Sequence, residues 1–302
     1  MSTGCDGNEP ATAANPVALD HAQRILFLGD SITWDGRYVA AFESWLLTRT
    51  RAPGRTVLNA GLPSETVSGL SEAGHANGDF ERPNLHERLD RVLEHVKPDL
   101  VFACYGMNCG IYEPFDEGRF ARYRDGITKL QGAATKAGAQ IVFITPAFYD
   151  NASESNRQAS YDEVLTRYSE WLVSRREIGW HVIDVHGPMQ REVARRRAIT
   201  PDFTFSPDGI HPDDAGHWFM AQQLIEYFGD ARASHSATQD EVPGLALGTY
   251  AIVRERMEIV RDGLLTATGH KHPTIPAGLP EEQVQAKVEE FDAKLKALYS
   301  TS

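Results

Sequence analysis

Short apolar runs alternate with longer helix-forming stretches through most of this 302-residue chain. Each run has the length of a buried strand, and each stretch between two runs is long enough for a helix. The runs begin at Ile25, Val57, Leu100, Ile141 and Val182. The stretches predict helices over about 35–50, 84–96, 117–137 and 156–177. Such alternation predicts an α/β fold, with a central parallel sheet that has helices on both faces.

The chain divides into four predicted parts. Residues 1–20 are small, polar and proline-containing, which indicates a flexible leader. Residues 21–230 form the main α/β domain, which a helix over about 212–228 closes. Residues 231–243 are small and charged and are interpreted as a linker. Residues 244–302 then form a C-terminal helical hairpin extension.

Each helix of this hairpin carries one apolar stripe. The stripes consist of Val253, Met257, Val260 and Leu264, then Val284, Val288, Phe291, Leu295 and Leu298. A two-helix hairpin cannot bury both stripes by itself. We therefore expect it to pack on the main domain, with a homo-oligomer through these helices as the alternative.

Charge and cysteine content exclude several classes of protein. A formal charge of -12 argues against nucleic acid or an anionic membrane as a partner. Cys5, Cys104 and Cys109 are too few for a disulfide framework, and their spacing does not indicate a zinc site. No stretch has the length of a membrane span, and the N-terminus lacks the apolar core of a signal peptide. The compartment stays open between cytoplasm and export after removal of a signal peptide.

Gly29-Asp30-Ser31 directly follows the first apolar run. Reactive groups of α/β proteins lie at the carboxyl ends of strands, where glycine permits a sharp turn. Capping of the next helix is the alternative role for Asp30 and Ser31. Three later segments decide between the two. They are Asn59-Ala60-Gly61, Gly106-Met107-Asn108 and Asp208-Gly209-Ile210-His211-Pro212.

Together these four segments hold the groups that acyl transfer requires. His211 can take the proton of the Ser31 hydroxyl, and Asp208 can hold the imidazole in the productive tautomer. Backbone N–H groups of Ser31 and Gly61 and the amide of Asn108 can stabilise an oxyanion. The sequence thus predicts a Ser-His-Asp triad with an oxyanion hole.

In this order, the four segments resemble the SGNH (GDSL-type) hydrolase superfamily, and the resemblance covers about residues 24–228. The resemblance implies a flavodoxin-like three-layer α/β/α fold and ester hydrolysis without metal or cofactor. It assigns functional positions to Ser31, Gly61, Asn108, Asp208 and His211. Cys109 departs from the family pattern, which has aspartate there, and predicts a less rigid loop around Asn108. A small, partly buried thiol is favoured over a reactive one.

Candidate substrate-binding residues flank these segments. They are Asp30, Trp34, Tyr38, Tyr105, Tyr112 and His75, the last within a glycine-rich loop over 69–84. Aromatic rings can stack on sugars or enclose a small acyl group. We therefore expect a short-chain esterase, acting on O-acetyl groups of a carbohydrate. The alternatives are a thioesterase, lysophospholipase or acyltransferase of the same fold, or a glycan-binding protein that has lost catalysis.

Overall fold

The computed structural model describes residues 17, 19–49, 55–151 and 161–300. Within them, five parallel strands form one sheet in the order β2-β1-β3-β4-β5. The strands are β1 (Arg24–Gly29), β2 (Thr56–Asn59), β3 (Leu100–Cys104), β4 (Gln140–Ile144) and β5 (His181–Ile183). This is the flavodoxin-like strand order, so the predicted fold class is confirmed.

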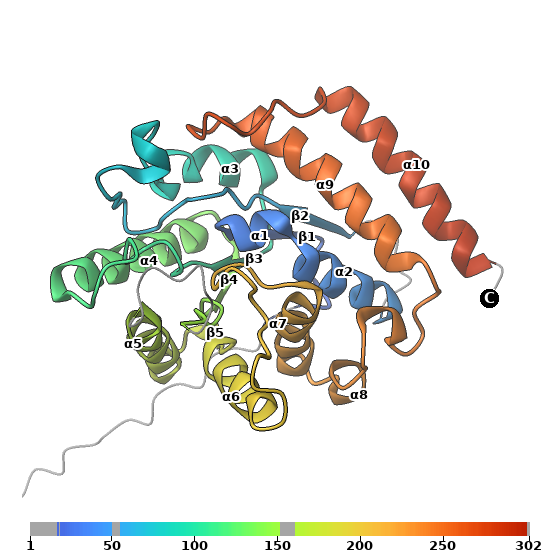
Figure 1. The fold of residues 1–302 in the computed structure, drawn as a ribbon. Helices are drawn as coiled ribbons and strands as arrows, with labels where there is room; N and C mark the ends of the chain where they lie inside the picture. Colours follow the sequence, from blue (N-terminus) through green and yellow to red (C-terminus); the bar gives the residue numbers. More distant parts are fainter. Residues whose placement is uncertain (1–16, 18, 50–54, 152–160, 301–302) are drawn as a thin grey trace, which may run out of the picture.

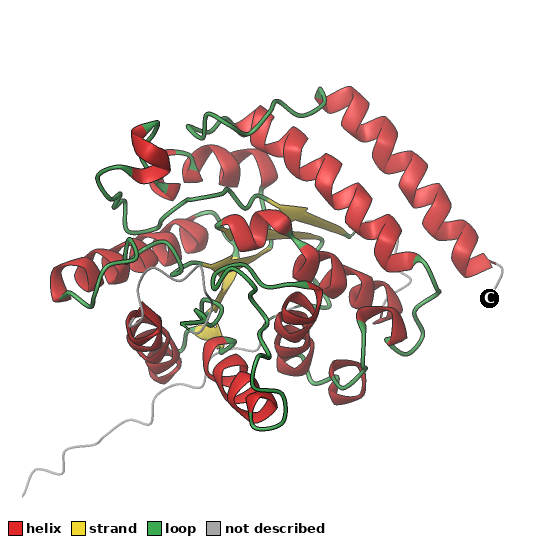
Figure 2. Ribbon diagram, in the orientation of Figure 1, coloured by secondary structure: helices red, strands yellow, loops and turns green. Residues whose placement is uncertain are grey.

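Helices enclose this sheet on both faces, as Figures 1 and 2 show. One face is covered by α3 (Leu89–Val96), α4 (Glu117–Lys136) and α5 (Tyr161–Ser174). The other is covered by α2 (Arg37–Arg49) and α7 (Asp214–Tyr227), which pack on each other. The 12-residue helix α6 (His186–Arg197) follows β5. The short elements of this domain are α1 (Ser31–Asp35), η1 (His75–Gly78), η2 (Leu85–Glu87) and η3 (Arg175–Ile178).

Two helix boundaries differ from the expected ones. The helix predicted over 35–50 begins at Arg37 as α2, because Gly36 adopts a left-handed φ of 76° and ends a separate short helix, α1, which was not predicted. The helix predicted over 156–177 ends at Ser174 and continues as the 3-10 turn η3. Its first residues, 156–160, lie outside the described part of the chain, as do most of the predicted leader and Cys5.

Parallel register brings the strand ends to one level. Gly29 of β1 pairs with Cys104 of β3, which in turn pairs with Ile144 of β4. Phe27 and Phe102 stack at 4.7 Å in the buried core and keep this register. The loops after β1, β2 and β3 therefore open at the same edge, at the point where the strand order reverses.

The C-terminal extension packs on the main domain. Its helices are α9 (Thr249–Thr268) and α10 (Glu281–Ser300), and α9 lies against α2 and β2. Val253 and Met257 of α9 join Ala40 of α2 and Leu295 of α10 in a small apolar cluster. The stretch expected to be a linker contains α8 (Ala231–Ser234) and η4 (Gln239–Glu241), and α8 packs on α7.

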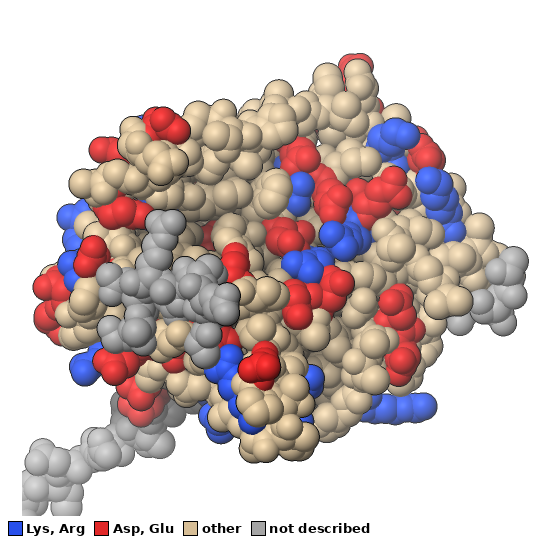
Figure 3. Space-filling view, viewed as in Figure 1, with Lys and Arg blue, Asp and Glu red and all other residues tan. Residues whose placement is uncertain are grey.

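Acidic and basic side chains are intermixed over the face shown in Figure 3. No helix within the described ranges combines the length and apolar character that crossing a membrane requires.

Candidate active site

Ser31, His211 and Asp208 form a hydrogen-bonded series at the carboxyl edge of the sheet. Ser31 Oγ lies 2.9 Å from His211 Nε2, and His211 Nδ1 lies 2.7 Å from Asp208 Oδ2. Ser31 is 180 residues from His211 in the sequence, and the fold brings the two side chains into contact. Such a series lets the imidazole accept the hydroxyl proton while the carboxylate fixes its tautomer.

The turn before Ser31 is tightly built. A Cβ on Gly29 would lie 2.0 Å from Thr33 Oγ1 and 2.8 Å from the Cys104 carbonyl oxygen, so only glycine fits. Asp30 Oδ1 accepts the N–H of Ile32 at 3.1 Å and caps α1. Burial raises the pKa of this carboxyl to about 6. Ser31 thus begins a helix whose orientation is held by buried neighbours.

The loop that carries His211 is shaped by Asp208. Asp208 Oδ1 accepts the N–H groups of Ile210 and His211, at 2.9 and 2.7 Å, while Oδ2 faces the ring. Partial burial opposes ionisation of Asp208, but hydrogen bonds from His211 and Ile210 outweigh it and lower the pKa. The carboxylate is therefore ionised at neutral pH and can accept a hydrogen bond from Nδ1.

The Asn108 amide is held from both ends. Its Nδ2 donates to the Glu65 carbonyl oxygen at 3.3 Å, and Tyr112 donates its hydroxyl hydrogen to Oδ1 at 3.0 Å. These two bonds fix which way the amide points. Ile111 and Tyr112 both have left-handed φ, 52° and 57°, which is uncommon outside glycine. A strained loop thus directs Tyr112 toward Asn108.

Gly61 has a packing role in this structure. Its N–H donates to Asn59 Oδ1 at 2.8 Å, so this group, expected in the oxyanion hole, already has an acceptor. A Cβ at Gly61 would lie 2.4 Å from the Trp34 nitrogen. Glycine is required here because the loop touches the backbone of α1.

Ser64 is a residue that the sequence reasoning missed. Glu65 N–H donates to the Leu62 carbonyl oxygen at 3.2 Å and closes a turn with Pro63 and Ser64 at its centre. Ser64 has a φ of 62°, as the third position of a type II turn requires. Among the described residues the Ser64 N–H has no acceptor, and it lies next in the chain to Glu65, whose carbonyl binds Asn108. The sequence feature that could have indicated this turn is Pro63, because proline is common at the second position of type II turns.

A buried ion pair ties this turn to the rest of the site. The Glu65 carboxylate accepts from Arg88 Nε and Nη2, at 2.6 and 2.7 Å, and from the Tyr105 hydroxyl at 2.7 Å. Arg88 Nη2 also donates to the Ala60 carbonyl oxygen at 2.7 Å. The loops after β2 and β3 are thereby joined below Asn108.

Three of the six candidate substrate residues are buried, which corrects the expectation that they contact substrate. Tyr38 and Tyr105 are 0% and 1% exposed, and their hydroxyls bond Thr33 and Glu65. Asp30 is 3% exposed, and its carboxylate accepts a hydrogen bond from the backbone N–H of Ile32 in α1.

The other three candidates are partly exposed: Trp34 on α1, Tyr112 beside Asn108, and His75 in the 69–84 loop. Trp34 follows Ser31 by three residues, and the Tyr112 hydroxyl bonds Asn108. His75 is turned toward its own loop, where its Nδ1 lies 3.2 Å from Glu72 Oε1 and its ring packs on Phe80. Of the six candidates, Trp34 thus lies on the helix that Ser31 begins, and Tyr112 contacts Asn108.

Cys109 is fully buried beside this loop. Burial raises the pKa of its thiol to about 12, so the group is uncharged at neutral pH. Its carbonyl oxygen accepts from Ser68 Oγ at 3.1 Å. An uncharged thiol without exposure is a packing group rather than a nucleophile.

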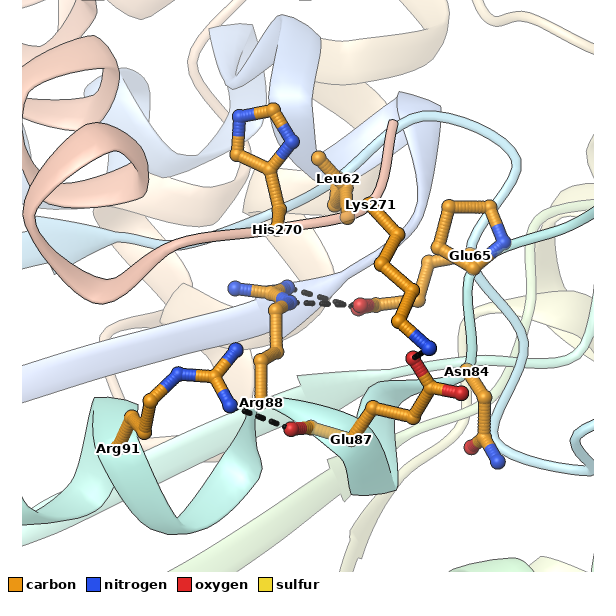
Figure 4. A pocket seen from close by; sticks show the side chains of 9 residues that line it. Leu62, Glu65, Asn84, Glu87, Arg88, Arg91, His270 and Lys271 are labelled. Carbon is orange, nitrogen blue, oxygen red and sulfur yellow. Dashed lines mark hydrogen bonds and ion pairs between the residues drawn. The ribbon is translucent and has the colours of Figure 1, made fainter. Parts of the chain in front are cut away.

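A cavity of about 380 Å³ lies beside the 62–65 turn. Figure 4 shows its lining, which comes from the turn, from η2 and α3, and from His270 and Lys271 after α9. Among the described residues, no group of three or more His, Cys, Asp or Glu side chains is arranged to hold a metal ion.

Similarity to known proteins agrees with this geometry. The model of the GDSL-like Lipase/Acylhydrolase family matches residues 27–219. No curated protein matches the chain significantly in sequence.

Several solved structures share the fold. One is BT4096, a gut microbial diltiazem-metabolizing enzyme, with 22% identity and a TM-score of 0.57; the match covers 72% of this chain and 49%, about half, of that one. A catalytic mutant of Axe2, an acetylxylan esterase from Geobacillus stearothermophilus, has 20% identity and a TM-score of 0.52, over 68% of this chain and 94% of that one. LAE5, an α/β hydrolase enzyme from the metagenome of Lake Arreo, has 21% identity and a TM-score of 0.50, over 73% and 98%. At these identities the likeness concerns the fold.

Proposed function

Because the chain belongs to the GDSL-like lipase/acylhydrolase family, we propose that it hydrolyses carboxylic esters with Ser31 as nucleophile. The observation that carries this proposal is the unbroken series Ser31–His211–Asp208, with contacts of 2.9 and 2.7 Å. His211 takes the Ser31 proton as Oγ attacks the ester carbonyl, then returns it to the leaving alcohol. Water, activated by the same imidazole, releases the acid from the acyl-enzyme.

The negative charge on the tetrahedral intermediate needs nearby donors. We assign this role to the N–H of Ser31, the Asn108 amide and the N–H of Ser64. Asn108 uses one amide hydrogen on Glu65 and retains the other. Ser64 takes the place expected for Gly61, since the Gly61 N–H is bound to Asn59.

For the substrate, we propose short acyl esters of a carbohydrate, with acetyl preferred. Two partly exposed rings, Trp34 and Tyr112, adjoin Ser31 and Asn108 and can enclose a small acyl group or stack on a sugar. The fold likeness to an acetylxylan esterase supports testing acetylated xylan fragments first.

The test is p-nitrophenyl ester hydrolysis across acyl lengths, with fluorophosphonate labelling of the protein. Ser31→Ala and His211→Ala should each lower kcat by at least about 10³-fold. Ser31→Ala should also abolish labelling. His95→Ala, on the exposed side of α3, is the matched control and should retain turnover. Unchanged hydrolysis in Ser31→Ala would refute the assignment.

A further inference from the structure

The cavity beside the 62–65 turn is built by two parts of the chain. One part contributes Glu87 of η2, Arg91 of α3 and Arg88 between these two elements. The other contributes His270 and Lys271, which follow α9. The last two lie outside the family-matched segment, 27–219. Arg91 fastens the two parts together, because Nε and Nη2 donate to the carbonyl oxygens of Thr268 and Gly269 at 2.7 and 3.2 Å. The C-terminal extension thus completes this cavity.

The cavity is linked to the proposed catalytic site through the 62–65 turn. Leu62 and Glu65 line it, and both belong to the turn that contains Ser64. The Leu62 N–H donates to the Gly29 carbonyl oxygen at 2.9 Å, and Gly29 precedes Ser31 by two residues, a span of about 7 Å at most. The Glu65 carbonyl oxygen binds Asn108. The 62–65 turn therefore lines the cavity and is also bonded to the segment before Ser31 and to Asn108.

The lining is suited to an oxygen-rich ligand. Only Leu62 and Pro83 have apolar side chains among the residues that line the cavity, and the others offer hydrogen-bonding groups. Its two carboxylates are already paired, Glu65 with Arg88 at 2.6 Å and Glu87 with Lys271 at 2.6 Å. The charge of Arg91 is left in excess, and it disfavours a cationic ligand. A volume of about 380 Å³ is within the range of small-molecule sites.

We propose that this cavity is the subsite for the alcohol part of the ester, a hydroxyl-rich sugar unit, and that Lys271 of the extension contacts it. The inference rests on the proposed function. It deepens that function, because it assigns the choice of alcohol to a segment beyond the family-matched region. The acyl group would lie at Ser31 while the sugar extends across the 62–65 turn.

The experiment compares two substrates with one acyl group, acetylated xylotriose and p-nitrophenyl acetate. The readout is the ratio of their kcat/KM values. Lys271 is largely exposed, so Lys271→Ala and Lys271→Trp are compatible with the fold. Lys271→Ala removes a charged hydrogen-bond donor. Lys271→Trp removes the same donor and adds a bulky ring that fills part of the cavity. We expect the ratio to fall about 10-fold with alanine and further with tryptophan.

Lys287→Trp, on the exposed side of α10, is the matched control and should leave the ratio as in the wild type. A ratio within about two-fold of wild type in both Lys271 variants would overturn the subsite. An equal loss on both substrates would also overturn it, because that result indicates a structural effect.

Failure of the proposed function has a different signature, namely that the wild type hydrolyses neither ester. Ligand-observed NMR with unacetylated xylotriose then decides the subsite independently. Binding to the wild type that is lost in Lys271→Trp supports it, and no binding to the wild type refutes it.

Discussion

Arg261 of α9 donates from Nη1 to the Trp34 carbonyl oxygen at 2.5 Å, and its guanidinium carbon lies 4.2 Å from the centroid of the indole ring. Trp34 belongs to the five-residue helix that Ser31 begins. A carbonyl near the end of a short helix has no partner within that helix. Arg261 supplies one from a part of the chain more than 200 residues away.

The first prediction concerns this contact. Arg261→Met removes the hydrogen bond and the cation–π contact but keeps a similar apolar volume. We expect kcat/KM for p-nitrophenyl acetate to fall about 10-fold, because α1 and Trp34 lose their support. Arg261→Lys, which keeps the charge and a donor, should lose less. The measurement is steady-state kinetics together with a denaturation curve for each variant.

Arg256→Met is the control for Arg261→Met, on the same helix. Arg256 pairs with Glu43 and Asp292, outside the site, so its loss should weaken the fold while kcat/KM is retained. Equal losses of kcat/KM in the two variants would mean that Arg261 acts only by holding the extension in place.

The second prediction concerns Ser64. A left-handed conformation costs a non-glycine residue about 1–2 kcal/mol, and the flexibility of unfolded glycine returns about 0.5–1 kcal/mol of this. Ser64→Gly should therefore raise the free energy of unfolding by up to about 1 kcal/mol. Ser64→Val should lower it, because a β-branched side chain resists this φ. Urea denaturation of both variants is the measurement, and a stabilising valine would contradict the turn geometry.

The third prediction concerns pH. Burial raises the pKa of Asp30 from 3.8 to about 6. Between these values the folded protein holds a proton that the unfolded chain has lost, so stability falls as pH rises. A shift of about two units corresponds to about 3 kcal/mol, fully lost above pH 6.

Asp30→Asn cannot ionise and still caps α1. It should unfold with a free energy close to that of the wild type at pH 4 and about 3 kcal/mol higher at pH 8. The comparison is made by urea denaturation at both values. A difference that does not change with pH would show that Asp30 titrates near its ordinary pKa.

The sheet could be predicted from sequence because strands buried on both faces must be continuously apolar. Ser31, Asp208 and His211 could be singled out for a related reason. Strand ends of a parallel sheet converge at one edge, and Asp-x-x-His closes its own turn, as the bonds from Ile210 and His211 to Asp208 show. These features depend on local spacing or on topology, both of which are visible in the chain.

The burial of individual site side chains and their contacts with distant parts of the chain could not be predicted from the sequence. Tyr38 and Tyr105 adjoin the right segments but point into the core, since sequence proximity does not determine which side of the backbone a ring occupies. Gly61 was expected to donate its N–H to the oxyanion. In the structure that N–H is bonded to Asn59, and the left-handed φ of this loop is at Ser64. The partners of Trp34 and of the cavity come from α9 and the residues after it, and no periodicity in the sequence indicates which atoms these touch.

The packing of α9 on α2 and β2 makes this helix part of the same folded body as the sheet. A chain shortened to end near residue 230 would retain Ser31, Asp208 and His211. It would lose Met257, whose side chain packs against Gly36 and Asn59. It would also leave Trp34 without its guanidinium partner. The family-matched segment, 27–219, therefore lacks two sets of contacts that the C-terminal extension supplies to the neighbourhood of Ser31.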